Sequence, residues 1–277
     1  MNQNYELIDS GDGQKLERFG PYVLQRPCQQ AIWPKKLPHW NGLADLSFSR
    51  EGGNNWKFFK NAPKSWNVEF SELLLKAAPT DFGHIGIFPE HQSHYEWMKS
   101  FIPKRENFKF LNLFAYSGAA SLYMAKHGAH VCHVDASKKI VDWAKENAKL
   151  SHLEDKPIRW IVDDAIKFIK REHNRGSFYH GILLDPPSFG RGAQGQVFKI
   201  EEMLFELLNC VKNVLDPNGS FICLTNHTPG LTGLVLKNCL DALKLPKGNF
   251  DCGEMVIPSD KGYSIPSGTY ATWSREN

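Results

Sequence analysis

The stretch Phe108-Lys-Phe-Leu-Asn-Leu-Phe-Ala-Tyr-Ser-Gly118 decides the fold. Its apolar run is typical of a buried strand, and Tyr116-Ser-Gly118 is typical of a turn. Apolar residues then recur at helical spacing until Gly128, a common stop at the end of a helix. A strand that passes through a glycine-containing turn into a helix predicts the first βα unit of a mostly parallel sheet.

The same alternation continues toward the carboxyl end of the chain. Helical patterns separate four further apolar runs and precede a terminal pair of strands, and these expected strands cover residues 130–135, 158–162, 179–185, 220–225, 250–257 and 269–274. The first 75 residues contain shorter, turn-rich pieces that favour strands. We therefore predict an α/β protein with a doubly wound sheet and a small N-terminal β-rich extension, with domains at 1–78 and 79–277.

Composition narrows the class of protein. The 277 residues carry a net charge of +3 and are 42% hydrophobic, as in an ordinary globular chain. No apolar run reaches the ~18 residues of a membrane span, and the N-terminus does not resemble a secretory signal, so we expect a cytoplasmic protein without membrane association. The six cysteines and eleven histidines are scattered without C-x-x-C or H-x-x-x-H spacing, so we expect neither disulfides nor a metal site.

Polar residues follow the predicted strands at the edge where doubly wound sheets bind ligands. Gly118 follows the first strand and lets the backbone approach a ligand closely. Asp135 follows the second, and its carboxylate suits the two hydroxyls of a ribose. Asp163-Asp164 and Asp185-Pro-Pro-Ser-Phe189 follow the third and fourth. Each aspartate is alternatively a helix cap or turn residue, so the joint pattern carries the interpretation.

That joint pattern resembles a known family. N-L-F-A-Y-S-G at 112–118, V-D-A-S at 134–137, V-D-D-A at 162–165 and L-D-P-P-S-F at 184–189 are similar to class I S-adenosylmethionine-dependent methyltransferases. Within them, the sequence resembles the branch that holds the bacterial 23S rRNA large-subunit methyltransferases I and K/L, over roughly residues 80–275. The resemblance implies a Rossmann-like seven-stranded sheet with an antiparallel last strand, S-adenosylmethionine as cofactor, and RNA, first of all ribosomal RNA, as substrate.

The resemblance also assigns residues to the cofactor. The first turn would line its methionine and ribose, Asp135 would hold the ribose hydroxyls, and the remaining positions would surround the adenine. The implied cofactor-binding residues are Asn112, Phe114, Ala115, Gly118, Asp135, Ala136, Ser137, Asp163, Asp164 and Ala165. A segment at Gly83–Gln92 corresponds to one that closes over the cofactor, although Pro89-Glu-His-Gln92 departs from the family pattern.

The fourth motif is where related enzymes present a planar base to the methyl group. Two prolines stiffen the loop, and Phe189 offers a face on which a base can stack. Its expected substrate-binding residues are Pro186, Pro187, Ser188, Phe189 and Arg191, with Asp185 and Asn226 in catalytic roles. For Phe189 the alternative is a core position, for Arg191 a solvated loop, and for Asn226 a turn.

The pattern also bears on the reaction. Formation of 5-methylcytosine requires a cysteine nucleophile, whereas the sequence has Thr225-Asn-His227 and Pro187-Ser188 where that cysteine would stand. We therefore predict methylation at a nucleobase nitrogen, which needs alignment of a lone pair rather than a covalent intermediate. The alternatives are a nicotinamide-dependent oxidoreductase, which would need the G-x-G-x-x-G turn that the first strand lacks, and a non-catalytic RNA-binding protein.

Overall fold

The computed structural model describes residues 5–40, 42–104, 106–191 and 197–276. The chain forms two compact units, Met1–Glu90 with Val256–Ser267, and His91–Met255 with Gly268–Asn277. The units thus divide after Glu90, whereas the sequence predicted a domain boundary after residue 78. The first unit also includes a segment from near the carboxyl end of the chain.

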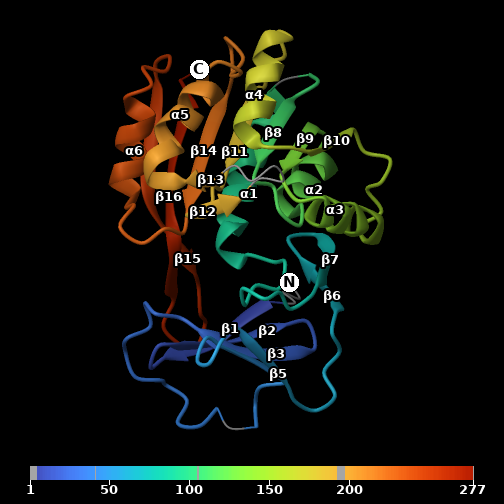
Figure 1. Ribbon diagram of the computed structural model, residues 1–277, viewed down its shortest axis with the longest axis vertical. Coiled ribbons are helices and arrows are strands. Elements are labelled where there is room, and N and C mark those ends of the chain that lie inside the picture. Colours follow the sequence, from blue (N-terminus) through green and yellow to red (C-terminus); the bar gives the residue numbers. More distant parts are fainter. Residues whose placement is uncertain (1–4, 41, 105, 192–196, 277) are drawn as a thin grey trace. The chain divides into compact units, whose positions relative to one another are not determined.

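A seven-stranded sheet organises the second unit (Figure 1). β11 pairs in parallel with β8 and β14, and β14 pairs antiparallel with β16, which confirms the predicted antiparallel last strand. The strand order reverses between β8 and β11, the point at which such sheets bind ligands. In spatial order the strands are β10 (Ile158–Val162), β9 (His130–Asp135), β8 (Lys109–Leu113), β11 (Gly181–Leu184), β14 (Phe221–Asn226), β16 (Ile265–Arg275) and β15 (Gly248–Ile257).

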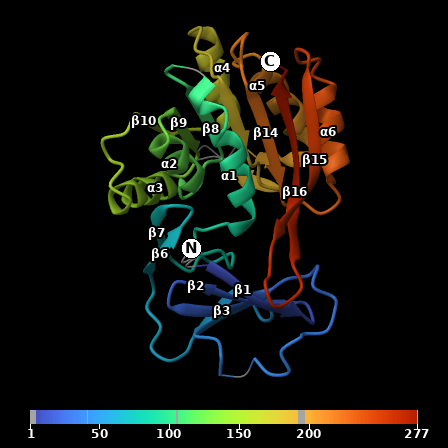
Figure 2. The ribbon, with the colours of Figure 1, turned by 180° about the vertical axis from the view of Figure 1, so that it is seen from behind.

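Helices cover both faces of this sheet (Figures 1 and 2). On one face lie α1 (Gln92–Lys99), α2 (Ala119–Lys126) and α3 (Lys138–Leu150), and on the other lie α4 (Ala165–Asn174), α5 (Ile200–Lys212) and α6 (Gly233–Asp241). The central strands are therefore buried on both sides, which explains why they read as continuous apolar runs instead of alternating. All four residues of β11 are buried, and so are all six of β14.

The first unit is β-rich, as predicted. It contains a five-stranded sheet of β1 (Tyr5–Gly11), β2 (Gln14–Phe19), β3 (Tyr22–Pro27), β4 (Leu46–Ser49) and β5 (Asn55–Phe58), and a hairpin of β6 (Trp66–Phe70) and β7 (Leu73–Ala77). A buried ion pair joins β2 to β3, because Arg26 Nη2 lies 2.6 Å from Glu17 Oε2. The Glu17 carboxylate also accepts a hydrogen bond from the Tyr5 hydroxyl at 2.9 Å.

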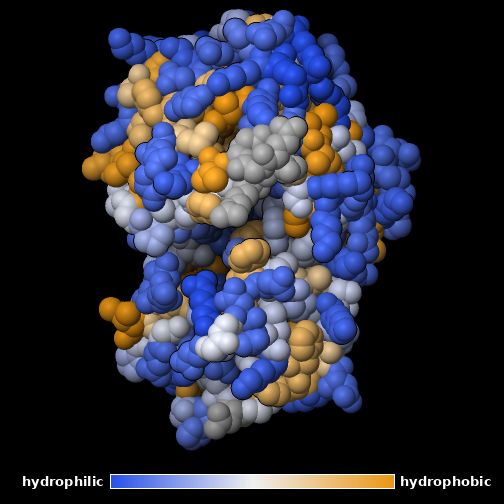
Figure 3. Space-filling model, in the orientation of Figure 1, coloured by the Kyte–Doolittle hydropathy of each residue, from blue (hydrophilic) through white to orange (hydrophobic). Residues whose placement is uncertain are grey.

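The surface on the face shown in Figure 3 is mainly hydrophilic, with hydrophobic residues in separate patches. In the described part of the chain, no helix has the length and apolar character needed to cross a membrane.

Candidate active site

The loop that follows β8 has an unusual backbone. Phe114, Tyr116 and Gly118 have φ angles of 56°, 48° and 89°, and a positive φ is costly for residues other than glycine. Gly118 caps α2 in the left-handed conformation, and a Cβ atom there would lie 2.8 Å from the Cβ of Ala144. The site therefore requires glycine, and the loop holds strain of the kind that clusters at ligand-binding positions.

Asp135 joins this loop to the end of β9. Its Oδ2 accepts a hydrogen bond from the Tyr116 amide at 3.1 Å, and its Oδ1 accepts one from the Ser137 amide at 2.9 Å. Burial raises the pKa of Asp135, while the two backbone hydrogen bonds lower it and leave a net increase. Ala136 and Ser137 are exposed beside it, and Ser137 is the N-cap of α3 without a side-chain capping bond.

The aspartates after β10 have structural partners. Asp164 is the N-cap of α4, and its Oδ1 accepts a hydrogen bond from the Lys167 amide at 2.9 Å. Asp163 accepts one from the Asp164 amide and forms an ion pair with Arg171, and Ala165 is buried in the first turn of α4. These contacts match the alternative of helix-capping residues, so their contact with an adenine stays a prediction.

Asn112, the fourth of the five residues of β8, belongs to a series of hydrogen-bonded buried polar side chains. Its Nδ2 donates to Ser121 Oγ at 3.0 Å, and that oxygen lies 3.0 Å from His133 Nδ1. Burial, helped by the charge of Lys145, lowers the pKa of His133 to about 3, so this imidazole is neutral at physiological pH. This series links β8, α2 and β9 beneath the strained loop, and a direct role of Asn112 in cofactor binding stays a prediction.

The fourth motif begins directly after β11. Asp185 Oδ1 accepts a hydrogen bond from Thr225 Oγ1 at 2.9 Å, and Ser188 Oγ lies 2.7 Å from Thr228 Oγ1. Pro186 is buried, whereas Pro187 and Ser188 are exposed. Phe189 is 52% exposed, which excludes the alternative of a core position.

A short hairpin continues from Phe189. It consists of β12 (Phe189–Arg191) and β13 (Val197–Lys199), which the sequence did not predict. Arg191 is the last residue of β12, and its side chain lies outside the described part of the structure.

Asn226, at the end of β14, is 1% exposed. Its Nδ2 donates to the carbonyl oxygens of Thr228 at 3.2 Å and Leu231 at 3.4 Å, and its Oδ1 accepts from the Thr228 amide at 3.0 Å. The side chain thus holds the loop after β14, as the turn alternative expects. A direct role in catalysis stays a prediction.

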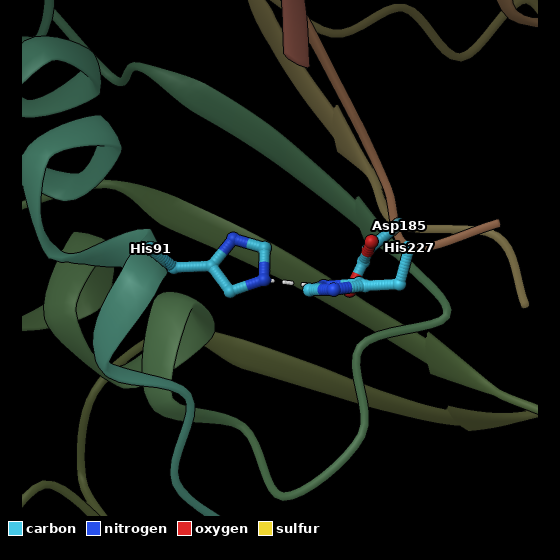
Figure 4. A group of neighbouring side chains, drawn as sticks. All are labelled: His91, Asp185 and His227. Carbon is cyan, nitrogen blue, oxygen red and sulfur yellow. Dashed lines mark ion pairs between the residues drawn. The ribbon is translucent and has the colours of Figure 1, made fainter. Parts of the chain in front are cut away.

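Two histidines that sequence reasoning did not assign to the site flank Asp185 (Figure 4). His91 ends the short 3-10 helix η1 (Pro89–His91), and His227 follows β14. Their Nε2 atoms lie 3.5 Å and 3.9 Å from Asp185 Oδ2. Burial by itself would raise the pKa of Asp185, but His227, His91 and Thr225 outweigh it and hold that pKa far below its usual range.

A signal for these histidines was present in the sequence. His91 lies in the Pro89–Gln92 segment that departs from the family pattern, and His227 lies in the Thr225-Asn-His227 run. Both departures place an imidazole near a motif, although neither indicates that the two rings meet at one carboxylate.

Known proteins share the sequence and the fold of this chain. Residues 91–235, slightly more than half of the chain, match the family model described as "Conserved hypothetical protein 95". The crystal structure of the SAM-dependent methyltransferase from Agrobacterium tumefaciens is 38% identical and superposes with a TM-score of 0.94, over 99% of this chain and 91% of that one. The chain belongs to the SAM-dependent methyltransferases.

Two further proteins are similar to this chain in fold alone or over only part of their length. A putative methyltransferase complexed with SAH shares the fold of this methyltransferase, with a TM-score of 0.75 at 18% identity over 98% of this chain and 75% of that one. The ribosomal RNA large subunit methyltransferase K/L of Pseudoalteromonas translucida is 33% identical over 179 residues, 61% of this chain and 24% of that protein. The methyltransferase thus spans about a quarter of the length of such curated relatives. Its family membership favours SAM-dependent methyl transfer over the dehydrogenase and non-catalytic alternatives.

Proposed function

We propose that this methyltransferase transfers the methyl group of S-adenosylmethionine to a nucleobase nitrogen in RNA, with ribosomal RNA as the first candidate. The observation that carries the proposal is the Asp185–Phe189 loop directly after β11, which combines a half-buried aspartate, a buried and an exposed proline, and an aromatic residue that is 52% exposed. Relatives that carry the name of ribosomal RNA large subunit methyltransferases support RNA as the substrate class.

The residues after β8 and β9 fit the cofactor. The tight backbone at Gly118 allows close approach of a ligand. Asp135 uses one acceptor position of each oxygen on a backbone amide, and each carboxylate oxygen has a second position for a ribose hydroxyl. S-adenosylmethionine, when bound, supplies an activated methyl group on a sulfonium sulfur. We assign the cofactor to this loop, with Ala136 and Ser137 beside the adenine.

On the acceptor side, the proposal gives each residue a distinct task. The Asp185 carboxylate is held anionic by its neighbours, and Thr225 fixes its orientation. Phe189 stacks on the base, an interaction that contributes about 1–3 kcal/mol per base. The rigid Pro186-Pro187 pair fixes the position of Phe189 relative to the Asp185 carboxylate. Catalysis then comes mainly from proximity and orientation of the base and the methyl group.

The cysteines support transfer without a covalent enzyme intermediate. Cys223, the cysteine nearest in sequence to the position of a 5-methylcytosine nucleophile, is fully buried within β14. Burial, with a smaller contribution from Asp185, raises the pKa of its thiol well above the usual range, and only the thiolate is an effective nucleophile. A nitrogen lone pair needs no such nucleophile, which favours nitrogen as the acceptor.

The test compares nucleosides from a deletion strain with those of its parent. Mass spectrometry of hydrolysed ribosomal and transfer RNA should show the loss of one N-methylated nucleoside, and purified protein with S-adenosylmethionine should restore it. A missing C-methylated or 2′-O-methylated nucleoside would overturn nitrogen as the acceptor atom. Unchanged RNA would overturn RNA as the substrate class.

Two phenylalanine variants then test the role of the loop. Phe189→Ala should lower kcat/KM roughly 5- to 150-fold, the equivalent of one stacked base, and should leave binding of S-adenosylhomocysteine unchanged. Phe205→Ala is the matched control, because Phe205 is 48% exposed on α5 and lies outside the strand-end loops. Equal kcat/KM in the two variants would contradict base stacking by Phe189.

A further inference from the structure

Three side chains from separate segments meet beside the Asp185–Phe189 loop. His91 comes from the segment before α1, Asp185 directly follows β11 and His227 directly follows β14. One potential ligand atom from each residue lies within 4.8 Å of the other two. In Figure 4 the His91 ring points across the gap toward Asp185 and His227.

The two imidazoles converge on one carboxylate oxygen at distances that suit ligands around a cation. The His91 and His227 Nε2 atoms approach the same oxygen, Asp185 Oδ2, at 3.5 Å and 3.9 Å, whereas an N–H···O bond is usually about 2.9–3.0 Å. Ligand bonds of about 2.1 Å in tetrahedral geometry place neighbouring ligand atoms about 3.4 Å apart. Side-chain rotations that draw the atoms together by at most about 1.5 Å therefore complete such a shell.

The surroundings orient the three groups. Thr225 Oγ1 donates to Asp185 Oδ1 at 2.9 Å and turns the other carboxylate oxygen toward the imidazoles. The His91 ring stacks on Tyr95 with an interplanar angle of 11°, which fixes the plane of the ring. Partners of this kind, outside the first coordination shell, are typical of protein metal sites.

Exposure of the cluster is uneven. The His91 side chain is 7% exposed, whereas those of Asp185 and His227 are 26% and 37% exposed. One side of the cluster is thus closed by the protein and the other side is accessible. Three protein ligands with an accessible side are the arrangement of sites that keep coordination positions for an exogenous ligand.

We propose that His91, Asp185 and His227 bind a divalent first-row transition metal ion of the zinc or iron(II) class. Two imidazoles favour such an ion over magnesium or calcium, which prefer oxygen ligands, and one carboxylate offsets half of its charge. Asp185 is the first residue of the loop that contains Phe189, so a donor oxygen or nitrogen of an acceptor substrate bound at this loop can complete the coordination shell. The proposal replaces the expectation of a metal-free protein, which rested on ligand spacing along the sequence.

Cobalt(II) is the probe, because its visible absorption reports both binding and geometry. The full-length protein, freed of metal with a chelator and dialysed, is titrated with Co²⁺ and then with Zn²⁺ as competitor. We expect a ligand-field band that saturates at one equivalent of Co²⁺ and disappears as Zn²⁺ displaces it. A wild-type protein that gives no saturable band would overturn the proposal.

Variants assign the signal to these residues. His227→Gln removes the most exposed ligand, and Asp185→Asn keeps the shape of the carboxylate; each should weaken Co²⁺ binding by roughly 10- to 100-fold or more. His130→Gln is the control, because His130 is exposed at the start of β9, and it should bind like the wild type. Retained binding of S-adenosylhomocysteine shows that each variant is folded.

Equal Co²⁺ affinity in His227→Gln and the wild type would place the ion elsewhere and refute the site. The titration contains no acceptor substrate, so its outcome is independent of whether RNA is methylated. Failure of the metal site and failure of the proposed function are therefore distinguishable.

Discussion

The substitution Asp135→Asn tests the assignment of the cofactor to the loop after β8. The variant keeps the size of the side chain and replaces one acceptor oxygen by an NH₂ group. Both oxygens of Asp135 already accept a backbone amide, from Tyr116 and Ser137. Whichever way the new amide turns, its NH₂ group faces one of these N–H donors, so one hydrogen bond is lost within the protein.

The effect on cofactor binding follows from the same geometry. One ribose hydroxyl loses its charged acceptor, and a hydrogen bond to a charged group contributes about 1.5–3 kcal/mol. At 1.4 kcal/mol per tenfold change, the Kd for S-adenosylhomocysteine should rise roughly 10- to 150-fold. Isothermal titration calorimetry measures this Kd directly and does not require the acceptor substrate.

Stability has to be measured separately, because the orphaned backbone amide costs about 1–3 kcal/mol of unfolding free energy. Thermal denaturation without ligand defines a temperature at which both proteins are folded, and the titrations are made there. Asp142→Asn is the control, since Asp142 forms an exposed ion pair with Lys138 on α3. A Kd for Asp135→Asn within twofold of the wild type would refute the proposed ribose contact.

Three further predictions concern the framework. Gly118→Ala should reduce both the unfolding free energy and the affinity for S-adenosylhomocysteine, because the new Cβ atom meets Ala144. The control is Gly128→Ala, where φ is 99° and a Cβ atom would have no neighbour within 4 Å. It should cost only about 1–2 kcal/mol of stability in thermal unfolding and leave the affinity unchanged. Glu17→Gln should cost about 3–5 kcal/mol in urea unfolding because it removes the negative charge that pairs with the buried Arg26. Glu6→Gln, at a half-exposed ion pair with Arg18, should cost less than about 1 kcal/mol; similar costs would contradict the role of burial. The pKa of buried Glu172 is lowered, since hydrogen bonds from Arg159, Tyr179 and Arg175 outweigh burial, which acts to raise it. Its contribution to stability is therefore complete above the unfolded-state pKa of about 4.3 and is lost as pH falls through the lower folded-state pKa; an acid-unfolding profile that does not flatten in Glu172→Gln would contradict this.

The sheet of the second unit was predictable because its strands are buried on both faces. A run such as Phe221–Asn226, buried at every position, has no counterpart in a loop or in an amphipathic helix of that length. Two pairings were less predictable. In the first unit, β3 joins β4 in parallel through Leu24 and Leu46 across the long segment between them, and in the second unit β12 and β13 are only three residues each. Such short strands depend on tertiary pairing more than on local sequence preference.

The candidate site was likewise predictable in part. The position of Asp135 at the end of β9 follows from the spacing of the motifs, and its hydrogen bond from the Tyr116 amide in the first loop agrees with that prediction. Exposure decided between alternatives that the sequence left open. It placed Phe189 at the surface and Asn226 in the interior, where its amide holds the loop after β14. Neither outcome is encoded in the residue type alone.

The sequence by itself indicated the class of fold, the order of the strand-end motifs and the position of Asp185, because each follows from the local pattern of apolar runs and the motifs that end them. Only the tertiary structure decided that His91 and His227 meet at Asp185. The parallel pairing of β11 with β14 brings two strand ends together, and the segment before α1 supplies the third side chain. Ligand spacing along a sequence detects sites whose ligands come in closely spaced pairs, whereas this cluster takes single residues from three segments far apart in the chain.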